Sequence, residues 1–194
     1  MEDFELVDRW RAGDKAAGQE LFQRHYRSVA RFFETKCGNE VDELLQATFF
    51  ACLRAKDQFR KESSFKTYLF AIARNQLYRL LRDRQRTAVD FEHSSIAQLI
   101  TTPGTKIDRN KEKARMIEAL QQLPVEQQTL LELYYWEQLS VAELAEVFEA
   151  EPATVRQRIH RARLALREQM EGLSPTGWFD SLESMDVWAQ KVGK

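Results

Sequence analysis

Apolar residues recur every three or four positions along most of this chain, and the repeat lapses over residues 87–107. This spacing gathers apolar side chains on one face of an α-helix, so it predicts helices on both sides of the lapse. The 194 residues include only 7 glycines and 4 prolines, whereas an all-β protein needs a turn about every 8–12 residues. We therefore predict an all-α fold of two small helical domains joined by a flexible linker.

The predicted helices form two sets of four. In the first domain, residues 1–88, we expect helices over residues 3–12, 15–36, 40–56 and from a cap at Ser63 or Ser64 to Arg86. The linker covers residues 89–107, with a turn at Pro103-Gly104 and a short helix around Ile96–Ile100. In the second domain, residues 108–171, we expect helices over residues 108–122, 125–137, 141–149 and 153–171.

Charge is distributed unevenly, although the formal net charge is only −1. Residues 60–86 carry a net +6 and residues 152–170 a net +4, while residues 87–151 carry a net −7. Blocks of one sign indicate contact with a polyanion, and two blocks indicate two contacts on it. The simpler alternative is two exposed helices with an excess of arginine. With acidic sequence between the basic blocks, we expect the unbound protein to fold compactly and cover its DNA-binding faces.

The end of the second domain has the pattern of a helix-turn-helix. Ser140 and Glu143 form an S-x-x-E capping box before a short helix, and a brief interval separates it from a basic helix. The apolar face of the basic helix consists of Val155, Ile159, Ala162 and Leu166. Its polar face consists of Thr154, Arg156, Gln157, Arg158, His160, Arg161, Arg163 and Arg167. Arginine suits guanine edges and phosphates and glutamine suits adenine, so we favour a DNA major groove over an acidic partner protein.

The helix predicted to end at Arg86 mixes aromatic and basic residues. Its expected outer face consists of Phe70, Arg74, Tyr78, Arg82 and Arg86, and the loop before it runs from Gln58 to Lys66. Aromatic rings stack on unpaired bases while basic side chains contact the phosphates of the strand, so this mixture of residues favours binding of single-stranded nucleic acid. Phe59 and Phe65 fit a core position equally well.

Four motifs in register resemble those of bacterial sigma-70 family RNA polymerase sigma factors, of the compact extracytoplasmic-function (ECF) group. In the first domain they are Glu43-Leu-Leu-Gln-Ala-Thr-Phe49 and Phe65-Lys-Thr-Tyr-Leu-Phe-Ala-Ile-Ala-Arg-Asn75. In the second they are Ser140-Val-Ala-Glu-Leu-Ala145 and Ala153-Thr-Val-Arg-Gln-Arg-Ile-His-Arg-Ala-Arg163, after Leu123-Pro124. The resemblance covers about residues 5–171. It implies a protein that binds core RNA polymerase, melts the −10 promoter element with its first domain and reads the −35 element with its second.

Site residues follow from the motif positions. The candidate −10 residues are Arg60, Lys61, Ser63, Ser64, Phe65, Lys66, Tyr68, Arg74, Asn75, Tyr78 and Arg82. The candidate −35 residues are Thr154, Arg156, Gln157, Arg158, His160, Arg161 and Arg163. The candidate polymerase-binding residues are Glu43, Gln46 and Phe50, whereas we expect Phe49 in the core. Asn75 is open to a second role, as a brace for the loop. The family's usual further partner is a regulatory anti-sigma protein.

Three departures from the family pattern stand out. Glu43 and Ala47 replace the usual Asp and Glu of the polymerase-binding helix, and Arg79 replaces a common Asp. The third is the interval from Phe148 to Ala153, which lacks the usual glycines. Glycine supplies positive φ most readily, so we expect the turn geometry or the helix start to shift here.

Other functional classes receive little support from the residues. Cys37 and Cys52 are expected to be buried, reduced thiols, and no metal or cofactor is expected. No apolar run is long enough to cross a membrane, and the acidic start does not resemble a signal peptide, so we expect a cytoplasmic protein without membrane insertion. An enzyme is not expected, because the three histidines lie in unrelated segments without a catalytic motif. The alternative to a sigma factor is a helix-turn-helix regulator that works without polymerase.

The C-terminal extension, residues 172–194, has no counterpart in the family motifs. Leu182, Met185 and Ala189 are spaced for one face of a short helix, with Trp178 and Phe179 before it. An exposed apolar patch of this size is unusual. We expect the extension to pack on the helix-turn-helix domain or to link the two domains, and so to tune DNA binding.

Overall fold

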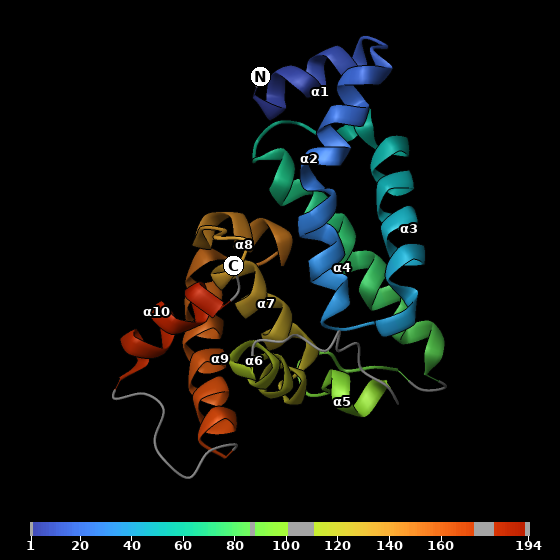
Figure 1. Ribbon diagram of the computed structural model, residues 1–194. Helices are drawn as coiled ribbons and strands as arrows, with labels where there is room; N and C mark the ends of the chain where they lie inside the picture. Colours follow the sequence, from blue (N-terminus) through green and yellow to red (C-terminus); the bar gives the residue numbers. More distant parts are fainter. Residues whose placement is uncertain (1, 86–87, 101–110, 173–180, 193–194) are drawn as a thin grey trace.

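The computed structural model describes residues 2–85, 88–100, 111–172 and 181–192, and over these ranges it contains helices and connecting segments but no β-strand. Figure 1 shows two groups of helices that pack side by side. The first group consists of α1 (Asp3–Arg11), α2 (Lys15–Glu34), α3 (Val41–Arg54) and α4 (Phe65–Arg84). The second consists of α6 (Lys111–Gln122), α7 (Val125–Tyr135), α8 (Val141–Val147) and α9 (Pro152–Gly172). The predicted all-α fold with two helical domains is confirmed.

Side-chain caps explain where several helices begin. The Asp14 carboxylate accepts hydrogen bonds from the backbone N–H groups of Ala16 and Ala17 at the start of α2. Of the two predicted caps for α4, Ser64 is the one used, since its Oγ accepts from the Thr67 N–H at 3.1 Å. The predicted capping box between Ser140 and Glu143 is present at α8. Each cap satisfies N–H groups that have no partner within the helix.

The described part of the linker packs against both groups of helices. It contains the short helix α5 (Ile96–Leu99), as predicted, with Ile96 and Ile100 buried. Backbone hydrogen bonds join it to the start of α7, from Val125 N–H to Ser94 O at 2.8 Å and from Glu126 N–H to Phe91 O at 3.0 Å. The predicted turn at Pro103-Gly104 lies outside the described residues. The described linker is therefore an ordered bridge between the two groups.

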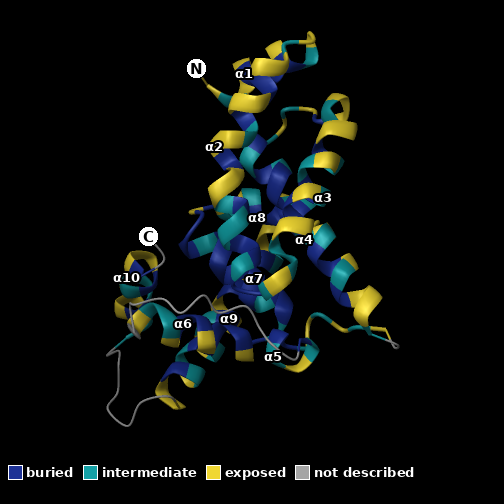
Figure 2. Ribbon diagram, turned by 45° about the vertical axis from the view of Figure 1, so that its right-hand side comes forward, coloured by how far each residue is buried: buried dark blue, intermediate teal, exposed yellow. Residues whose placement is uncertain are grey.

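Two apolar clusters form the core, and Figure 2 shows the buried residues running through both groups of helices. The first cluster fills the α1–α4 bundle and continues without a break into buried residues of α7, α8 and α9, such as Leu133, Leu144 and Val155. The second joins α6, α7 and α9 to the C-terminal helix α10 (Leu182–Val192). The expected compact arrangement is thus confirmed for the described residues.

A buried polar network crosses the boundary between the two groups. The Lys36 ammonium at the end of α2 forms an ion pair with the Glu132 carboxylate of α7, and both side chains are almost fully buried. Glu132 also accepts from Thr35 Oγ1 at 3.0 Å and from Gln128 Nε2 at 2.8 Å. Gln121 of α6 donates to the Thr35 carbonyl at 2.7 Å. Burial lowers the pKa of Lys36 below its ordinary value, although the carboxylate of Glu132 acts in the opposite direction.

Two further carboxylates tie the second group to the first. Glu137 pairs with Arg31 of α2 at 3.0 Å and with Lys66 of α4 at 2.8 Å. Glu143 of α8 accepts from Ser64 Oγ and from Thr67 Oγ1, both at 3.0 Å, so one side chain links the starts of α4 and α8. Burial opposes ionisation of Glu143, but these bonds and those from Ser140 outweigh it and hold its pKa below its ordinary value.

This packing corrects the sequence-based view of α4. Phe70 and Tyr78, expected on its outer face, are buried at 1% and 7% exposure. The Phe32 ring of α2 packs on Phe70, and the Phe91 ring of the linker packs on Tyr78. Phe65 and Phe59 are also buried, so the core alternative holds for both. The helix therefore has apolar contacts on two sides.

The C-terminal extension packs on the helix-turn-helix domain, which confirms the first of the two expected arrangements for residues 181–192. Met185, Ala189 and Val192 of α10 are buried against α6, α7 and α9. The Trp136 indole N–H donates to the Ala189 carbonyl at 3.3 Å. Trp178 and Phe179 lie outside the described residues.

Glu132→Gln should destabilise the protein, because it leaves the buried Lys36 charge without its counter-ion. We expect a loss of about 3–5 kcal/mol of unfolding free energy in denaturant titrations. Glu146→Gln, at an exposed site on α8, is the matched control and should change little. A loss below about 1 kcal/mol for Glu132→Gln would contradict the buried pair, since that is the range of surface ion pairs.

The two native thiols should be almost inert in the folded protein. Cys37 and Cys52 are free and fully buried, and burial raises the pKa of each to about 12. At neutral pH this leaves roughly a thousandfold less thiolate than an exposed cysteine has. A thiol reagent should therefore modify an introduced cysteine at exposed Asp57 first and the native thiols only on unfolding. Rapid modification of either native thiol would show that its surroundings are open.

Candidate nucleic-acid interface

The start of α9 presents four polar side chains to solvent together. Val155, Ile159, Ala162 and Leu166 are buried, as predicted, which turns the opposite face outward. The exposed residues there are Arg156, Gln157, His160 and Arg161, and these four line one shallow depression. Two or more guanidinium groups beside an amide suit base edges and phosphates of a duplex. This part of the predicted recognition surface is accessible as it stands.

The turn between α8 and α9 keeps its tight form without glycine. Glu149 adopts φ +51°, a conformation that costs a non-glycine residue roughly 1–2 kcal/mol. Its N–H bonds to the Glu146 carbonyl at 3.2 Å, and the Ala150 N–H bonds to the Ala145 carbonyl at 2.9 Å. Glu149 therefore supplies the positive φ for which a glycine was expected, and α9 begins at Pro152, one residue before its predicted start.

Two predicted duplex-binding arginines are held by carboxylates within the protein. Arg158 forms an ion pair with Glu126 of α7 and lies 3.7 Å from Glu92 of the linker. The Arg163 guanidinium donates two hydrogen bonds to the Asp186 carboxylate of α10, at 2.9 and 2.5 Å. The Tyr135 hydroxyl donates to the same carboxylate at 2.5 Å. Thr154, the remaining member of the set, is half-buried.

The predicted −10 residues lie along α4 and the loop before it, but they differ in access. Arg60, Asn75 and Arg82 are exposed, and Lys61 pairs with Asp8 of α1. Ser63 is half-buried beside the cap Ser64. Tyr68 is half-buried, with its ring stacked on Phe59 at 4.9 Å and its hydroxyl donating to the Ala55 carbonyl at 3.0 Å.

The other members of this set contact the second group of helices or the linker, except Phe65, whose ring packs among those of His25, Phe59 and Tyr68. Ser64 and Lys66 bond to Glu143 and Glu137, and Phe65 is in the core. The Arg74 guanidinium lies over the rings of Tyr78 and Phe148, at 4.4 and 5.0 Å from their centroids. The structure thus places part of the −10 set at the surface and part behind α8.

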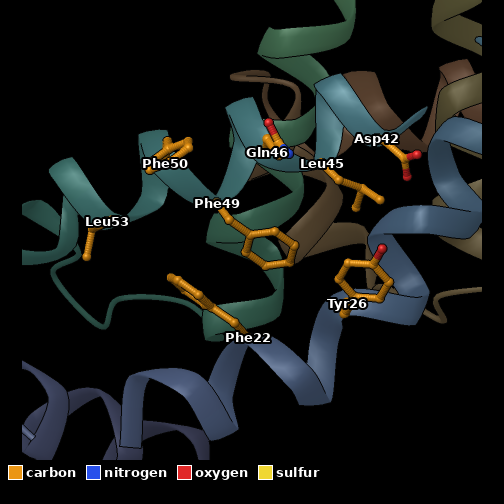
Figure 3. A pocket seen from close by; sticks show the side chains of 8 residues that line it. All are labelled: Phe22, Tyr26, Asp42, Leu45, Gln46, Phe49, Phe50 and Leu53. Carbon is orange, nitrogen blue, oxygen red and sulfur yellow. The ribbon is translucent and has the colours of Figure 1, made fainter. Parts of the chain in front are cut away.

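A second exposed surface lies between α2 and α3, where Figure 3 shows an apolar groove. Its lining consists of Phe22, Tyr26, Asp42, Leu45, Gln46, Phe49, Phe50 and Leu53. The predicted polymerase-binding residues Glu43, Gln46 and Phe50 are all exposed, Phe50 at 60%. Phe49 is half-buried and belongs to both core and groove, with its ring 4.9 Å from that of Phe22.

Sequence reasoning missed three exposed members of this groove, Tyr26, Asp42 and Leu53. A signal for Leu53 was present, because Glu43, Gln46, Phe50 and Leu53 follow a helical spacing of three, four and three residues. No comparable pattern marks Tyr26. Its ring stacks with that of Phe49 at 6.2 Å, a contact between helices.

Other kinds of site are not indicated in the described part of the chain. No group of three or more His, Cys, Asp or Glu side chains there is arranged to hold a metal ion. None of its helices is both long and apolar enough to span a membrane.

Comparison with known proteins identifies the family. Residues 20–87 match the family model "Sigma-70 region 2" and residues 113–166 match "Sigma-70, region 4". The RNA polymerase sigma-H factor of Pseudomonas aeruginosa is 32% identical over 186 residues, which cover 89% of this chain and 95% of that protein. The ECF RNA polymerase sigma-E factor of Haemophilus influenzae is 28% identical, covering 89% of this chain and 97% of that protein. The chain belongs to the sigma-70 family of RNA polymerase sigma factors, in its ECF group.

A solved structure supports the same assignment. CnrH, in complex with the cytosolic domain of CnrY, is 25% identical and superposes with a TM-score of 0.65, covering 89% of this chain and 99% of that chain. Like other sigma factors, this ECF sigma factor serves promoter-specific transcription initiation. The first matched region contains the basic helix α4, and the second contains most of the basic helix α9.

Asp186→Asn should strengthen binding of the free sigma factor to duplex DNA, because it releases Arg163 to contact a phosphate. We expect about a threefold to tenfold gain, with the salt dependence of binding steeper by about one counterion. Anisotropy titrations of a labelled duplex at several salt concentrations measure both. Glu118→Gln removes the same charge from an exposed site on α6 and is the control. Equal gains for both variants would show a general charge effect.

Proposed function

We propose that the exposed start of α9 reads the −35 duplex of the promoter. The observation that carries this proposal is the clustering of Arg156, Gln157, His160 and Arg161 on one accessible face of a helix whose other face is buried. Arg158 and Arg163 would join them once Glu126 and Asp186 release them. Thr154, at the start of the helix, lies where a phosphate contact is expected.

We propose that the groove between α2 and α3 binds core RNA polymerase. Phe50 and Tyr26 expose 60% and 50% of their surfaces there, Gln46 adds a polar group to the lining, and Glu43 is exposed on the same helix, α3. Exposed aromatic rings beside polar groups are typical of the centre of a protein interface. A helix of the polymerase is the expected occupant.

We propose that α4 and its preceding loop hold the opened −10 strand. Arg60, Asn75 and Arg82 are accessible in the free protein, whereas Lys66 and Arg74 are half-buried and Tyr78 is buried. These three would be fully exposed only when α8 and the linker move away. Full engagement of promoter DNA therefore includes separation of the two groups of helices. We assign these roles to the domains predicted from the sequence: the first domain, residues 1–88, the linker, 89–107, the second domain, 108–171, and the C-terminal extension, 172–194.

The wider biology follows from the same proposal. The polymerase performs the chemistry, so the sigma factor contributes no catalytic step, needs no cofactor and works in the cytoplasm beside the polymerase. CnrH is held by the cytosolic domain of CnrY in its solved structure. By analogy, a regulatory anti-sigma protein is the proposed further partner of this chain.

Reconstituted transcription tests the proposal. Purified bacterial core polymerase and this protein, with a pool of promoter duplexes of random −35 and −10 sequence, should yield discrete transcripts that core polymerase alone does not yield. Arg156→Ala should lower promoter affinity about tenfold and shift the −35 preference, because one base contact is worth about 1–3 kcal/mol. Phe50→Ala should weaken polymerase binding by a similar factor.

Arg27→Ala is the matched control, since Arg27 is exposed on the side of α2 away from the groove and should leave both properties unchanged. Normal polymerase binding by Phe50→Ala would remove the groove from the proposal. Duplex binding without promoter-specific transcripts would instead favour a regulator that works without polymerase.

A further inference from the structure

The linker places one aromatic ring directly on the basic helix α4. The Phe91 ring stacks on that of Tyr78, with centroids 4.0 Å apart and planes 22° apart. Phe91 is fixed there by its own backbone, since its carbonyl accepts the hydrogen bond from the Glu126 N–H. Tyr78 is 7% exposed under this cover. Nothing in the helical pattern of either segment requires this contact between a linker and a helix of the first domain.

Two guanidinium groups lie against the same pair of rings. Arg74 lies 4.4 Å from the centroid of Tyr78, and Arg82 lies 6.0 Å from that of Phe91. A hollow beside the rings is lined by Arg74, Tyr78, Arg82, Asp90, Phe91, Glu92 and Glu126, among others. Rings between arginines form the kind of site that binds an unpaired base, by stacking and by cation–π attraction.

Carboxylates flank the inserted ring on both sides. Asp90 and Glu92 are exposed neighbours of Phe91, and Glu92 lies 3.7 Å from Arg158 on the predicted recognition helix. The Phe91 ring between the carboxylates of Asp90 and Glu92 corresponds to one base of a DNA strand with a phosphate on either side of its nucleotide. The segment Asp90–Glu92 therefore resembles single-stranded DNA in the properties that α4 would recognise.

We propose that Tyr78, with Arg74 and Arg82, forms a stacking site for one unpaired base of single-stranded DNA, and that Asp90–Glu92 occupies this site in the free protein. The inference rests on the proposed role of α4 in holding the opened strand. Because the competitor belongs to the same chain, a DNA strand binds only to the fraction of molecules in which the linker has left. Because Phe91 covers Tyr78 of α4 and Glu92 lies beside Arg158 of α9, departure of this one segment would expose residues of both DNA-binding helices.

Binding of a short fluorescein-labelled DNA strand of random sequence to the full-length protein tests this competition. Phe91→Ala should raise affinity about fivefold to tenfold, because it removes the competing ring. Glu92→Gln, an exposed change that does not threaten folding, should raise it about twofold to threefold by removing a negative charge from the lining of the hollow. Leu99→Ala, a half-buried linker residue away from the stack, is the matched control and should not raise it.

The same measurement identifies the site. In a protein that carries Tyr78→Leu, the gain from Phe91→Ala should disappear, since the ring on which a base stacks is gone. A gain that persists without the Tyr78 ring, or an equal gain from Leu99→Ala, would overturn the proposal. So would unchanged affinity in both Phe91→Ala and Glu92→Gln.

The outcome separates this inference from the proposed function. Promoter-specific transcription together with unchanged single-strand affinity in the linker variants would refute the inference alone. A gain that depends on Tyr78, without promoter-specific transcription, would refute the proposed function and leave the stacking site in place.

Discussion

The ion pair between Lys36 and Glu132 is the interaction on which the closed arrangement of this sigma factor depends. The Lys36 ammonium and the Glu132 carboxylate are buried together when α7 packs on the end of α2. Removing either charge alone would leave the other buried without a counter-ion. Such a pair adds little net stability, because its attraction is offset by desolvation, yet it strongly disfavours partly formed interfaces. A boundary of this kind should be open or closed, with little in between.

This boundary explains why the candidate DNA-binding residues differ in access. The carboxylates of Glu137 and Glu143 fasten α4 to the second group, and Phe91 covers Tyr78. On the far side, Asp186 holds Arg163. Acidic side chains of the same chain thus occupy positions that phosphates would take, which is consistent with the net −7 charge between the two basic blocks. The exposed residues of α9 and the groove on α3 remain free for a first contact.

Much of the fold could be predicted from the sequence because it depends on local periodicity. The helices predicted with bounds in the two domains begin and end within two residues of those bounds, except that α6 begins at Lys111, three residues after its predicted start, and the Ser140–Glu143 capping box needed only its spacing. The burial of Phe70 and Tyr78 was not predictable from the pattern of α4, since it depends on rings of other segments, Phe32 of α2 and Phe91 of the linker. The same holds for the carboxylates on Arg158 and Arg163. The positive φ at Glu149 was missed because the surrounding structure, not the residue type, imposes it.

The distance between the two groups of helices, with and without core polymerase, tests the central claim most directly. Fluorescent labels at Asp57→Cys and Glu168→Cys, both exposed sites, report this distance, because the native thiols are buried. A closed sigma factor predicts one narrow, short distance in the free protein and a longer one when polymerase and promoter DNA are bound. A broad distribution in the free protein, or a distance that polymerase and promoter leave unchanged, would contradict the account.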